Sequence, residues 1–509
     1  MEVGRGGLIR SRKGCETCRA RHVKCDEGKP SCQRCRKDGR KCDGYKTTQN
    51  RPLNRTPEPE KRAALSALPT LPDFEGSRQR DLFAFYVSCI SDASSLYFGV
   101  GFWGRCVLQL SLSEAAIRYA LCSLSALQRS TTISDPATQH CSRLELRTCA
   151  LQQYNHAVRH TRRLLSESSD GSTDKLVKGL VACALFVCYE SFTGNHELSH
   201  MHLENGLRII AREYRRQRHT AIPKEIVQVF RRLDLQVKSI GNAKVSHPND
   251  GCAEPIELVS TVPPSFTSFE DSLDVIHQLV AWILQKPAHT APCPISPADS
   301  AAANKFLADW YRGIEDISRD LDSAPANLQR SVALLKMHQI IMTVIVDVVL
   351  HRRETLHNAY LDRYEQIVAL ADALICDVQR SGSGNFFCFD IGVILPLFWV
   401  GTKCRESGVR RRAIALLASM SHQEGIWKSG TAARVAQVIV DVEEEGLPPG
   451  VHQEDVPETA RVHWVATIED DEKGVCYATC LLRSDVDEVS WYTRERSFPI
   501  VESPRSLES

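Results

Sequence analysis

Most of this chain has apolar residues at the three-to-four spacing that is typical of amphipathic helices. The pattern begins in SRQRDLFAFYVSCI (residues 77–90), continues through LSEAAIRYALCSLSALQRS (112–130), and ends in TAARVAQVIVDVEEE (431–445). We see no alternation of strands with helices and no glycine-rich phosphate-binding loop in it. We therefore expect a mainly α fold in which residues 76–440 form a large all-α domain of solenoid-like helices.

Two proline-rich breaks, near residues 248–264 and 287–297, divide the predicted helices into blocks. The longest apolar runs are LVACALFVCY (180–189) and IGVILPLFWVG (391–401). Both runs are shorter than the roughly 20 residues that a membrane-spanning helix needs, so we expect no membrane partner. The first residues also lack the apolar stretch of a secretory signal, which favours a reducing compartment without structural disulfides.

Residues 46–75 differ from the rest of the chain in composition. They contain five prolines within KTTQNRPLNRTPEPEKRAALSALPTLPDF and show no sustained heptad pattern. This composition predicts a flexible linker rather than a dimerising coiled coil.

The formal net charge of +1 conceals a strong asymmetry along the chain. Residues 1–62 carry 18 Lys and Arg against 8 Asp and Glu, whereas the remainder carries 45 against 54. Residues 1–62 thus have a net charge of +10, and the remainder of the chain has a net charge of −9. This asymmetry indicates that the N-terminal segment binds a polyanion.

Six of the twenty cysteines lie in two copies of one pattern, CETCRARHVKC (15–25) and CQRCRKDGRKC (32–42). Clustered thiols in a reducing compartment indicate metal, and zinc takes four tetrahedral ligands. Two zinc ions need eight coordination positions, and six sulfurs supply them when the leading cysteine of each copy bridges both ions. The predicted ligand sets are Cys15, Cys18, Cys25 and Cys32 for one ion, and Cys32, Cys35, Cys42 and Cys15 for the other.

The spacing C-x2-C-x6-C-x6-C-x2-C-x6-C, with Pro30 between the halves, resembles the zinc binuclear cluster DNA-binding domain of fungal transcription factors. The resemblance assigns residues 10–45 to this domain, with double-stranded DNA as the partner and the zinc ions in a structural role. It implies that a short helix over residues 19–24 enters the major groove and reads a CGG-like triplet. His22 stands where the family usually has Lys or Arg. The candidate DNA contacts are Arg12, Lys13, Arg19, Arg21, His22 and Lys24.

Two further stretches, FGVGFWGRCVLQLSLSEAAIRYALCSLSAL (98–127) and ALFVCYESFTGNHELSHMHLENGLRII (184–210), resemble the fungal-specific regulatory domain that accompanies this cluster. The resemblance implies a nuclear, sequence-specific transcription factor that acts on RNA polymerase II promoters. It further implies control of a metabolic or secondary-metabolite biosynthetic gene cluster. A homodimer or heterodimer would form through the helical body.

The C-terminal segment, residues 441–509, is acidic, with 17 acidic and 6 basic residues. Acidic side chains alternate with Trp464, Trp491 and aliphatic residues, a composition typical of activation segments that contact the transcription machinery. The alternative is a pair of strands that turn at DEKG (471–474).

The segment HELSH matches the H-E-x-x-H motif of zinc metallopeptidases, with His196 and His200 as ligands and Glu197 as general base. Gly194 and Asn195 place this motif at the start of a helix rather than inside one, and no third ligand has a suitable spacing. We therefore expect no enzyme activity. A second alternative is a structural zinc module that mediates protein–protein interactions.

Overall fold

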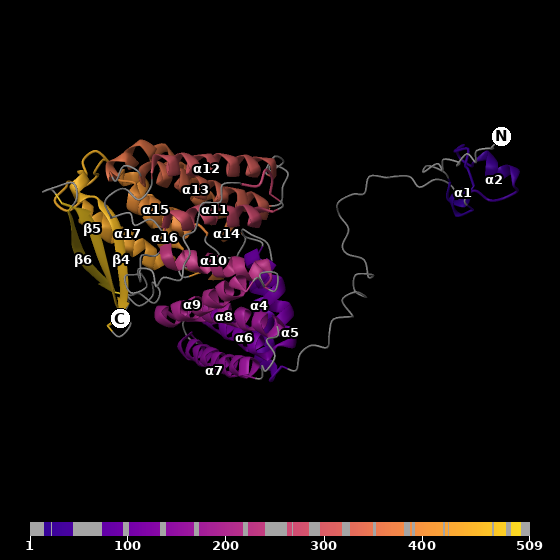
Figure 1. The fold of residues 1–509 in the computed structure, drawn as a ribbon, viewed down its shortest axis with the longest axis horizontal. Coiled ribbons are helices and arrows are strands. Elements are labelled where there is room, and N and C mark those ends of the chain that lie inside the picture. Colours follow the sequence, from indigo (N-terminus) through magenta and orange to yellow (C-terminus); the bar gives the residue numbers. More distant parts are fainter. Residues whose placement is uncertain are drawn as a thin grey trace. The chain divides into compact units, whose positions relative to one another are not determined.

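The computed structural model describes residues 15–21, 23–43, 74–94, 101–132, 139–166, 173–216, 222–239, 262–266, 268–284, 296–317, 326–349, 353–380, 387–388, 392–420, 423–425, 427–470, 473–484 and 490–499. The chain divides into two units, Met1–Leu71 and Pro72–Ser509 (Figure 1). The predicted linker at 46–75 falls outside the described residues except for its last two positions.

The N-terminal unit contains one five-residue helix in each copy of the cysteine repeat. Helix α1 (Glu16–Ala20) begins directly after Cys15, and α2 (Gln33–Lys37) begins directly after Cys32. The core of this unit is made of cysteine side chains, with Val23 packed against them. So small a core buries too little apolar area to hold the chain folded, so its stability must come from bound metal.

The second unit begins with a helical block that has its own hydrophobic core. Its elements are α4 (Ser77–Ser94), a π-helical turn (Gly101–Cys106), α5 (Val107–Ser113), α6 (Ala115–Thr132), α7 (Gln139–Ser166), α8 (Thr173–Thr193), α9 (His196–Arg215) and α10 (Lys224–Ser239). Leu121, Leu185 and Phe230 are among its fully buried side chains. Helix α9 approaches α10 so closely that a Cβ at Gly206 would collide with the ring of Phe230.

A second helical block follows, with a separate core. Its elements are α11 (Phe269–Leu284), α12 (Pro297–Ile317), α13 (Ala326–Val349), a 3-10 helix (Glu354–Tyr360), α14 (Leu361–Arg380), α15 (Ile394–Lys403), α16 (Ser407–Ser419) and α17 (Ser429–Glu443). Trp310 lies at its centre, and its indole Nε1 donates a 2.7 Å hydrogen bond to the carbonyl oxygen of Ser272. A half-buried ion pair between Arg232 of α10 and Asp274 of α11, at 2.8 Å, joins the two blocks.

The prediction of a mainly α fold in two helical blocks is confirmed. The solenoid-like stacking of the helices stays a prediction. Helices α8 and α13 include two stretches that are long and apolar enough to cross a membrane, Thr173–Thr193 and Leu328–Val348. The expectation from the continuous apolar runs, that no segment has sufficient length, is therefore wrong. In both stretches, 61% of the apolar window is buried in the helical cores, which accounts for the apolar composition without a membrane.

The C-terminal segment forms a three-stranded antiparallel sheet in the order β4 (Val462–Asp470), β5 (Val475–Arg483), β6 (Trp491–Pro499). Alternate residues of β5, from Cys476 to Leu482, face inward and are buried, and the sheet packs on α17. The strand pair turning near residues 471–474 is therefore the alternative that the structure contains. A second, small sheet joins β1 (Phe387–Cys388), β2 (Gln423–Glu424) and β3 (Trp427–Lys428).

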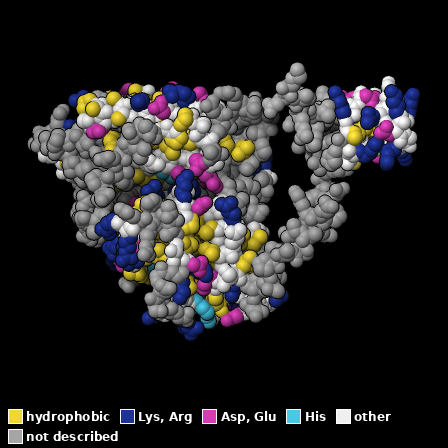
Figure 2. Space-filling model, turned by 45° about the vertical axis from the view of Figure 1, so that its right-hand side comes forward, with side chains coloured by type: hydrophobic (Ala, Val, Ile, Leu, Met, Phe, Trp, Pro, Cys, Tyr) yellow, Lys and Arg dark blue, Asp and Glu magenta, His cyan; other side chains and the backbone are white. Residues whose placement is uncertain are grey.

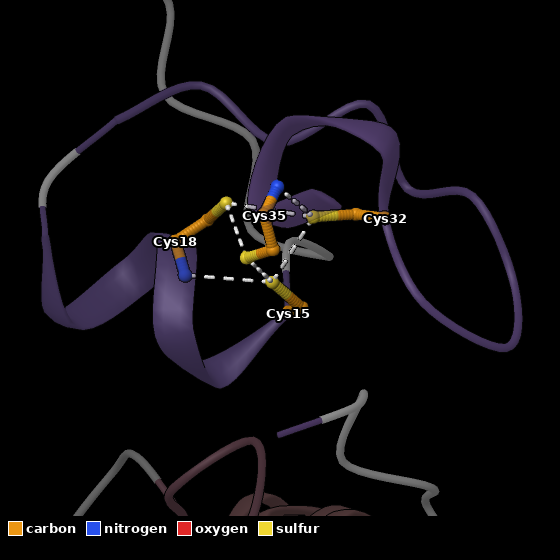
Figure 3. A group of neighbouring side chains, drawn as sticks. All are labelled: Cys15, Cys18, Cys32 and Cys35. Atoms are coloured by element: carbon orange, nitrogen blue, oxygen red, sulfur yellow. Dashed lines mark hydrogen bonds between the residues drawn. The ribbon is translucent and has the colours of Figure 1, made fainter. Parts of the chain in front are cut away.

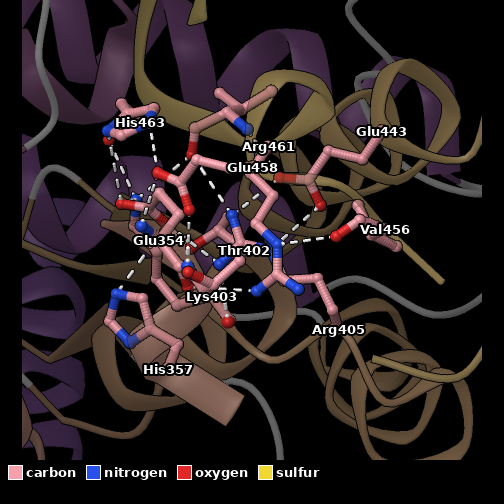
Figure 4. A network of polar contacts seen from close by, with 12 residues as sticks. Glu354, His357, Thr402, Lys403, Arg405, Glu443, Val456, Glu458, Arg461 and His463 are labelled. Atoms are coloured by element: carbon pink, nitrogen blue, oxygen red, sulfur yellow. Dashed lines mark hydrogen bonds and ion pairs between the residues drawn. The ribbon is translucent and has the colours of Figure 1, made fainter. Parts of the chain in front are cut away.

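A network of buried charges joins the second block to the C-terminal sheet (Figure 4). Glu354 accepts a 2.8 Å hydrogen bond from Lys403 Nζ and lies 2.9 Å from Arg405 Nη1. Arg405 also contacts Glu443, with 2.7 Å between Nη2 and Oε1, and Glu443 pairs in addition with Arg410. The side chains of Arg405, Arg410 and Glu443 have no exposed area, so each charge depends on its partners.

The main chain of β4 completes this network. Val462 N donates a 2.7 Å hydrogen bond to Glu443, and Lys403 Nζ donates to the carbonyl oxygens of Val462 and His463 at 3.2 and 2.9 Å. The predicted domain boundary at residue 440 lies inside α17, and the described part of 441–509 is packed into the body. The acidic segment is therefore not a separate tail over these residues.

Buried histidines predict that the body loses stability in acid. Burial lowers the pKa of His338 to about 4 and that of His357 to about 3. A free histidine titrates near pH 6.5, so between about 6.5 and 4 the unfolded chain binds more protons than the folded chain. Stability is therefore complete above this window and falls as the pH drops through it. Each such histidine contributes up to about 1.4 kcal/mol per pH unit.

Thermal unfolding followed by circular dichroism between about pH 7 and about pH 5 measures this loss. His338→Gln should show a shallower dependence of the melting temperature on pH than the unchanged chain. Two parallel curves would contradict the assignment of His338.

Candidate metal centre and nucleic-acid interface

The two C-x2-C pairs are held by the first turn of a helix. Cys15 Sγ accepts a hydrogen bond from Cys18 N at 3.4 Å, and Cys32 Sγ accepts one from Cys35 N at 3.3 Å. The leading sulfur of each copy thus caps its helix, as a serine or aspartate oxygen does elsewhere. In each pair, the helical turn brings the second cysteine close to the first. The two sulfurs of a pair therefore lie on the same side of their helix.

The sulfurs of Cys15, Cys18, Cys32 and Cys35 lie within 4.8 Å of one another (Figure 3). Cys15 Sγ is 3.6 Å from Cys32 Sγ and 3.8 Å from Cys35 Sγ, and Cys18 Sγ is 3.7 Å from each of the same two atoms. Zinc binds thiolate sulfur at about 2.3 Å, so the edge of a regular sulfur tetrahedron is about 3.8 Å. The sulfur separations therefore fit zinc coordination.

The third cysteine of each copy lies at the edge of this group. Cys25 Sγ accepts a hydrogen bond from Cys15 N at 3.4 Å, and Cys42 Sγ accepts one from Cys32 N at 3.5 Å. Cys25 Sγ also lies within 4.8 Å of Cys32 Sγ and of a carboxylate oxygen of Asp26. The four-sulfur group differs from the predicted sets, since it takes both C-x2-C pairs and leaves Cys25 and Cys42 outside.

Burial raises the pKa of the Cys15 thiol well above its usual range and also raises the pKa of the Cys18 thiol. Buried thiolates are unstable without a compensating cation, so these side chains can ionise only when a cation binds among them. Residues 15–43 contain nine Lys and Arg against five Asp and Glu. Dark blue basic side chains are dense on this unit in Figure 2, and they offset the negative charge of a thiolate cluster.

Aspartates hold the two repeats together across an approximate two-fold relation. Asp26 of the first copy accepts hydrogen bonds from Gln33 N and Arg34 N, at 2.9 and 2.8 Å, and so caps α2. Its counterpart 17 positions later, Asp43, accepts a 2.8 Å hydrogen bond from Thr17 Oγ1 in α1. Each copy therefore supports the helix of the other.

Arg21 and Asp38 also occupy equivalent positions in the two copies, 17 residues apart. Arg21 Nη2 lies 2.9 Å from Asp38 Oδ2, and their side chains are 30% and 29% exposed. Arg34 Nε lies 3.7 Å from the same carboxylate oxygen. The predicted DNA contact Arg21 is therefore engaged in an ion pair between the repeats.

The predicted recognition helix over residues 19–24 is wrong in its bounds. Helix α1 starts at Glu16 and ends at Ala20, Arg21 lies in a turn, and Val23 and Lys24 have no regular secondary structure. The helix starts earlier because Cys15 caps it. Lys24 is exposed, and Arg19 lies in the last turn of α1 with its side chain outside the described part. Arg12, Lys13 and His22 lie outside the described residues.

The H-E-x-x-H segment forms the first turn of α9, with Asn195 as its N-cap. His200 Nδ1 lies 3.7 Å from Glu204 on the same helix, and Ser199 Oγ lies 2.7 Å from Ser191 Oγ of α8. Among the described residues, no group of potential metal ligands includes His196 or His200. The segment packs α9 on α8, which gives it a structural role.

Sequence reasoning missed Asp26, Thr17, Asp38 and Asp43 as residues that shape the site. For the three aspartates the signal is the offset of 17 residues, since it makes Asp26 equivalent to Asp43 and Arg21 equivalent to Asp38, whereas nothing in the repeat identifies Thr17. Near the two-fold axis that relates the copies, a residue of one copy lies beside the equivalent residue of the other. Opposite charges at equivalent positions, such as Arg21 and Asp38, therefore predict an ion pair.

Two family models match the chain. The fungal Zn(2)-Cys(6) binuclear cluster domain matches residues 13–52, and the fungal specific transcription factor domain matches residues 81–235. The second match coincides with the first helical block, from α4 to α10. Both describe a transcription regulator rather than an enzyme.

A curated relative covers nearly the whole chain. It is the aspercryptin biosynthesis cluster-specific transcription regulator atnN of Emericella nidulans, which is 25% identical over 572 aligned positions. The match spans 89% of this chain and 91% of the relative. No solved structure matches the chain. The chain thus carries the fungal Zn(2)-Cys(6) binuclear cluster domain and, behind it, the fungal specific transcription factor domain, the two domains of a fungal zinc cluster transcription regulator.

Proposed function

We propose that this transcription factor reads a CGG-like triplet through a cluster of two zinc ions. Cys15 and Cys32 bridge the ions, Cys18 and Cys25 complete one site, and Cys35 and Cys42 complete the other. The observation that carries this proposal is the 3.6 Å separation of the two leading sulfurs, those of Cys15 and Cys32, next to a helix whose surroundings are basic. Cys18 Sγ lies 3.7 Å from Cys32 Sγ, and Cys35 Sγ lies 3.8 Å from Cys15 Sγ, so each proposed set contains a tetrahedral edge. The peripheral position of Cys25 and Cys42, each hydrogen-bonded to the leading cysteine of a copy, supports the assignment.

The proposed DNA contacts are Arg12, Lys13, Arg19, Arg21, His22 and Lys24. Side chains that follow a short helix can donate hydrogen bonds to guanine edges, and the flanking basic residues bind phosphate. Selection of bound sequences from a random DNA pool with the zinc-loaded full chain tests the proposal. The recovered sequences should share a CGG-like triplet, and recovery without any enriched sequence would contradict it.

Arg21 gives a sharper test of the contact surface. Arg21→Ala should weaken binding to the selected DNA by about 1–3 kcal/mol, because the variant loses a guanidinium that can reach a base edge or a phosphate. Asp38→Asn should have a smaller effect, since an exposed ion pair contributes only about 0.2–1 kcal/mol to the position of Arg21. Fluorescence anisotropy with labelled DNA at several salt concentrations measures both.

The matched control is Arg40→Ala, which removes an exposed arginine of the second repeat. An unchanged affinity for Arg21→Ala, with zinc still bound, would show that Arg21 serves only the ion pair. A flatter salt dependence at reduced affinity would assign Arg21 to phosphate rather than to a base.

The proposal extends to a nuclear role at RNA polymerase II promoters of a secondary-metabolite gene cluster. The relative named for the aspercryptin cluster supports it. Deleting the gene and sequencing transcripts should show losses concentrated in one group of neighbouring biosynthetic genes. Losses scattered over the genome would contradict this role.

Contact between residues 441–509 and the transcription machinery also belongs to this proposal. The outer face of the sheet presents Trp464 and Tyr477, which are 41% and 37% exposed. Because the sheet packs on α17, a reporter fusion should include the whole body, residues 74–509. Replacing Trp464 and Tyr477 by serine should then reduce reporter output, and unchanged output would remove this assignment.

A further inference from the structure

The C-terminal halves of α7 and α9 are rich in exposed arginine. Residues 157–166 of α7 contain three arginines and no acidic residue, and residues 204–216 of α9 contain four arginines and two glutamates. The chain beyond residue 62 has an excess of acidic residues, so this basic composition is local. All seven arginines are exposed, and they are Arg159, Arg162, Arg163, Arg208, Arg212, Arg215 and Arg216.

Helix α8 fixes the direction of α7. The ring of Tyr154 in α7 stacks on that of Tyr189 in α8, with 4.0 Å between the ring centroids. Toward the other end of α7, Leu165 Cδ2 lies 3.2 Å from the position that a Cβ would take at Gly179 of α8. Residue numbers thus rise along α7 while they fall along α8, so the two helices are antiparallel.

Helix α9 is also antiparallel to α8. Ser199 Oγ lies 2.7 Å from Ser191 Oγ, and Cys183 Sγ donates a 3.0 Å hydrogen bond to the carbonyl oxygen of His202. Helices α7 and α9 are therefore parallel, and a 3.4 Å contact between Tyr154 Oη and His202 Nε2 places these two residues at the same level. The seven arginines all follow this level, so they lie at one end of the first block. We call them the arginine surface.

Glutamates compensate only part of this charge. Glu204 lies 3.0 Å from Arg208, and Glu213 lies 3.4 Å from Arg212 and 3.3 Å from Arg216. The other four arginines pair with no acidic residue in the part of the chain that the structure describes, and they are Arg159, Arg162, Arg163 and Arg215. Over the described residues, the arginine surface therefore keeps a positive charge that the fold does not use.

The helix dipole does not account for the arginine surface. Basic side chains stabilise a helix from its last turn, and the effect falls off within that turn. Arg159 lies seven residues before the end of α7 at Ser166, and Arg208 lies seven residues before the end of α9 at Arg215. Both are about two turns from the helix ends, so the cluster exceeds what the stability of the two helices needs.

We propose that the arginine surface binds the phosphate backbone of the DNA duplex that the zinc unit reads. Guanidinium groups bind phosphate through two parallel hydrogen bonds, and every cation of this surface is an arginine. Contacts of this kind add affinity without reading sequence. The inference rests on the proposed function, because the zinc unit is what brings the duplex to the body.

The connecting segment is long enough for both contacts to form at once. Thirty residues, 44–73, join the described parts of the two units, and a chain of this length spans at most about 110 Å. A duplex held by the zinc unit is therefore at high effective concentration for the body. This favours DNA over a separate acidic protein as the partner of the arginine surface.

Binding of the zinc-loaded full chain to two duplexes tests the proposal. The short duplex holds the selected triplet and little more than the site of the zinc unit. The long duplex carries the same triplet within about 40 base pairs, or about 136 Å, and so also offers phosphates to the body. In fluorescence anisotropy at about 0.15 M salt, the unchanged chain should bind the long duplex on the order of tenfold more tightly.

The combined change Arg159→Gln, Arg162→Gln and Arg163→Gln should remove this preference for the long duplex. Each lost phosphate contact lowers the slope of log affinity against log salt by about 0.9, so three lost contacts should lower it by about 3. The affinity for the short duplex should not change, because the zinc unit is intact.

The matched control removes three exposed cations of the second block, through Lys336→Gln, Arg363→Gln and Arg380→Gln. It changes the net charge by the same amount and should keep the preference for the long duplex. Equal melting temperatures for the two combined variants would show that both are folded.

Equal affinities of the unchanged chain for the two duplexes would refute the proposal. A preference that survives the change on α7, which would leave the arginine surface to an acidic protein, or one that the control loses as well, would also refute it. Failure of the proposed function gives a different result, because the short duplex would then be bound without dependence on its triplet. The salt slopes on the long duplex would still report on the arginine surface.

Discussion

Cys32→Ala should remove bound zinc and all sequence-specific DNA binding from the protein. Cys32 Sγ lies 3.6 Å from Cys15 Sγ, 3.7 Å from Cys18 Sγ, and accepts the hydrogen bond from Cys35 N. Its loss takes a ligand from both proposed ions and the cap from α2. Because residues 15–21 and 23–43 form no other core, an apparent metal-binding free energy of about 10–16 kcal/mol is lost together with the fold of the unit.

Elemental analysis of the purified chain and anisotropy with the selected DNA measure the two effects. Cys376→Ala is the control, since this exposed thiol lies on α14 and should leave zinc content and affinity unchanged. Cys18→Ala should be intermediate, because Cys18 belongs to one proposed site only. Retention of both zinc ions by Cys32→Ala would overturn the bridging role.

Glu443→Ala should destabilise the body by about 3–5 kcal/mol, the usual result of breaking a buried ion pair on one side. Burial by itself raises the pKa of Glu443, but the neighbouring Arg405 and Arg410 reverse this and hold the pKa below its usual range. The carboxylate therefore stays charged at neutral pH. Without it, Arg405 keeps only Glu354 and Arg410 keeps only Glu444, at 3.5 Å, as acidic partners in the described interior. Val462 N also loses its acceptor.

Chemical denaturation followed by tryptophan fluorescence measures this change. Glu445→Ala is the matched control, because Glu445 is 57% exposed and pairs with arginines on the surface of β6. That change should cost less than about 1 kcal/mol. If the two variants unfold at the same denaturant concentration, the network does not stabilise the body.

The zinc unit was predictable because its ligands are close in sequence. Six cysteines within residues 15–42 carry the metal chemistry in their spacing, and periodicity within one helix predicts the helices of the body. The bounds of the recognition helix were not predictable in this way. A helix cap depends on the position of one sulfur in space, and Cys15 moves the start of α1 to Glu16.

The buried charges escaped prediction for another reason. The segment KCRESGVRRRAI, residues 403–414, has the composition of a solvated surface. Its acidic partners lie far away along the chain, Glu354 at 49 residues from Lys403 and Glu443 at 38 residues from Arg405. Local composition cannot show that such groups meet in the interior. For the same reason, the acidity of residues 441–509 suggested a free tail, although part of that charge is used internally.

The dependence of the second block on the main chain of Val462 and His463 bears on how the protein is made. During synthesis, the zinc unit is complete once residue 43 has left the ribosome, whereas the charges around Glu354 stay without their last partners until residue 463. Shortened translation products that end between these points contain the complete zinc unit. Their second block, however, lacks the main-chain partners on β4 for Lys403 and Glu443.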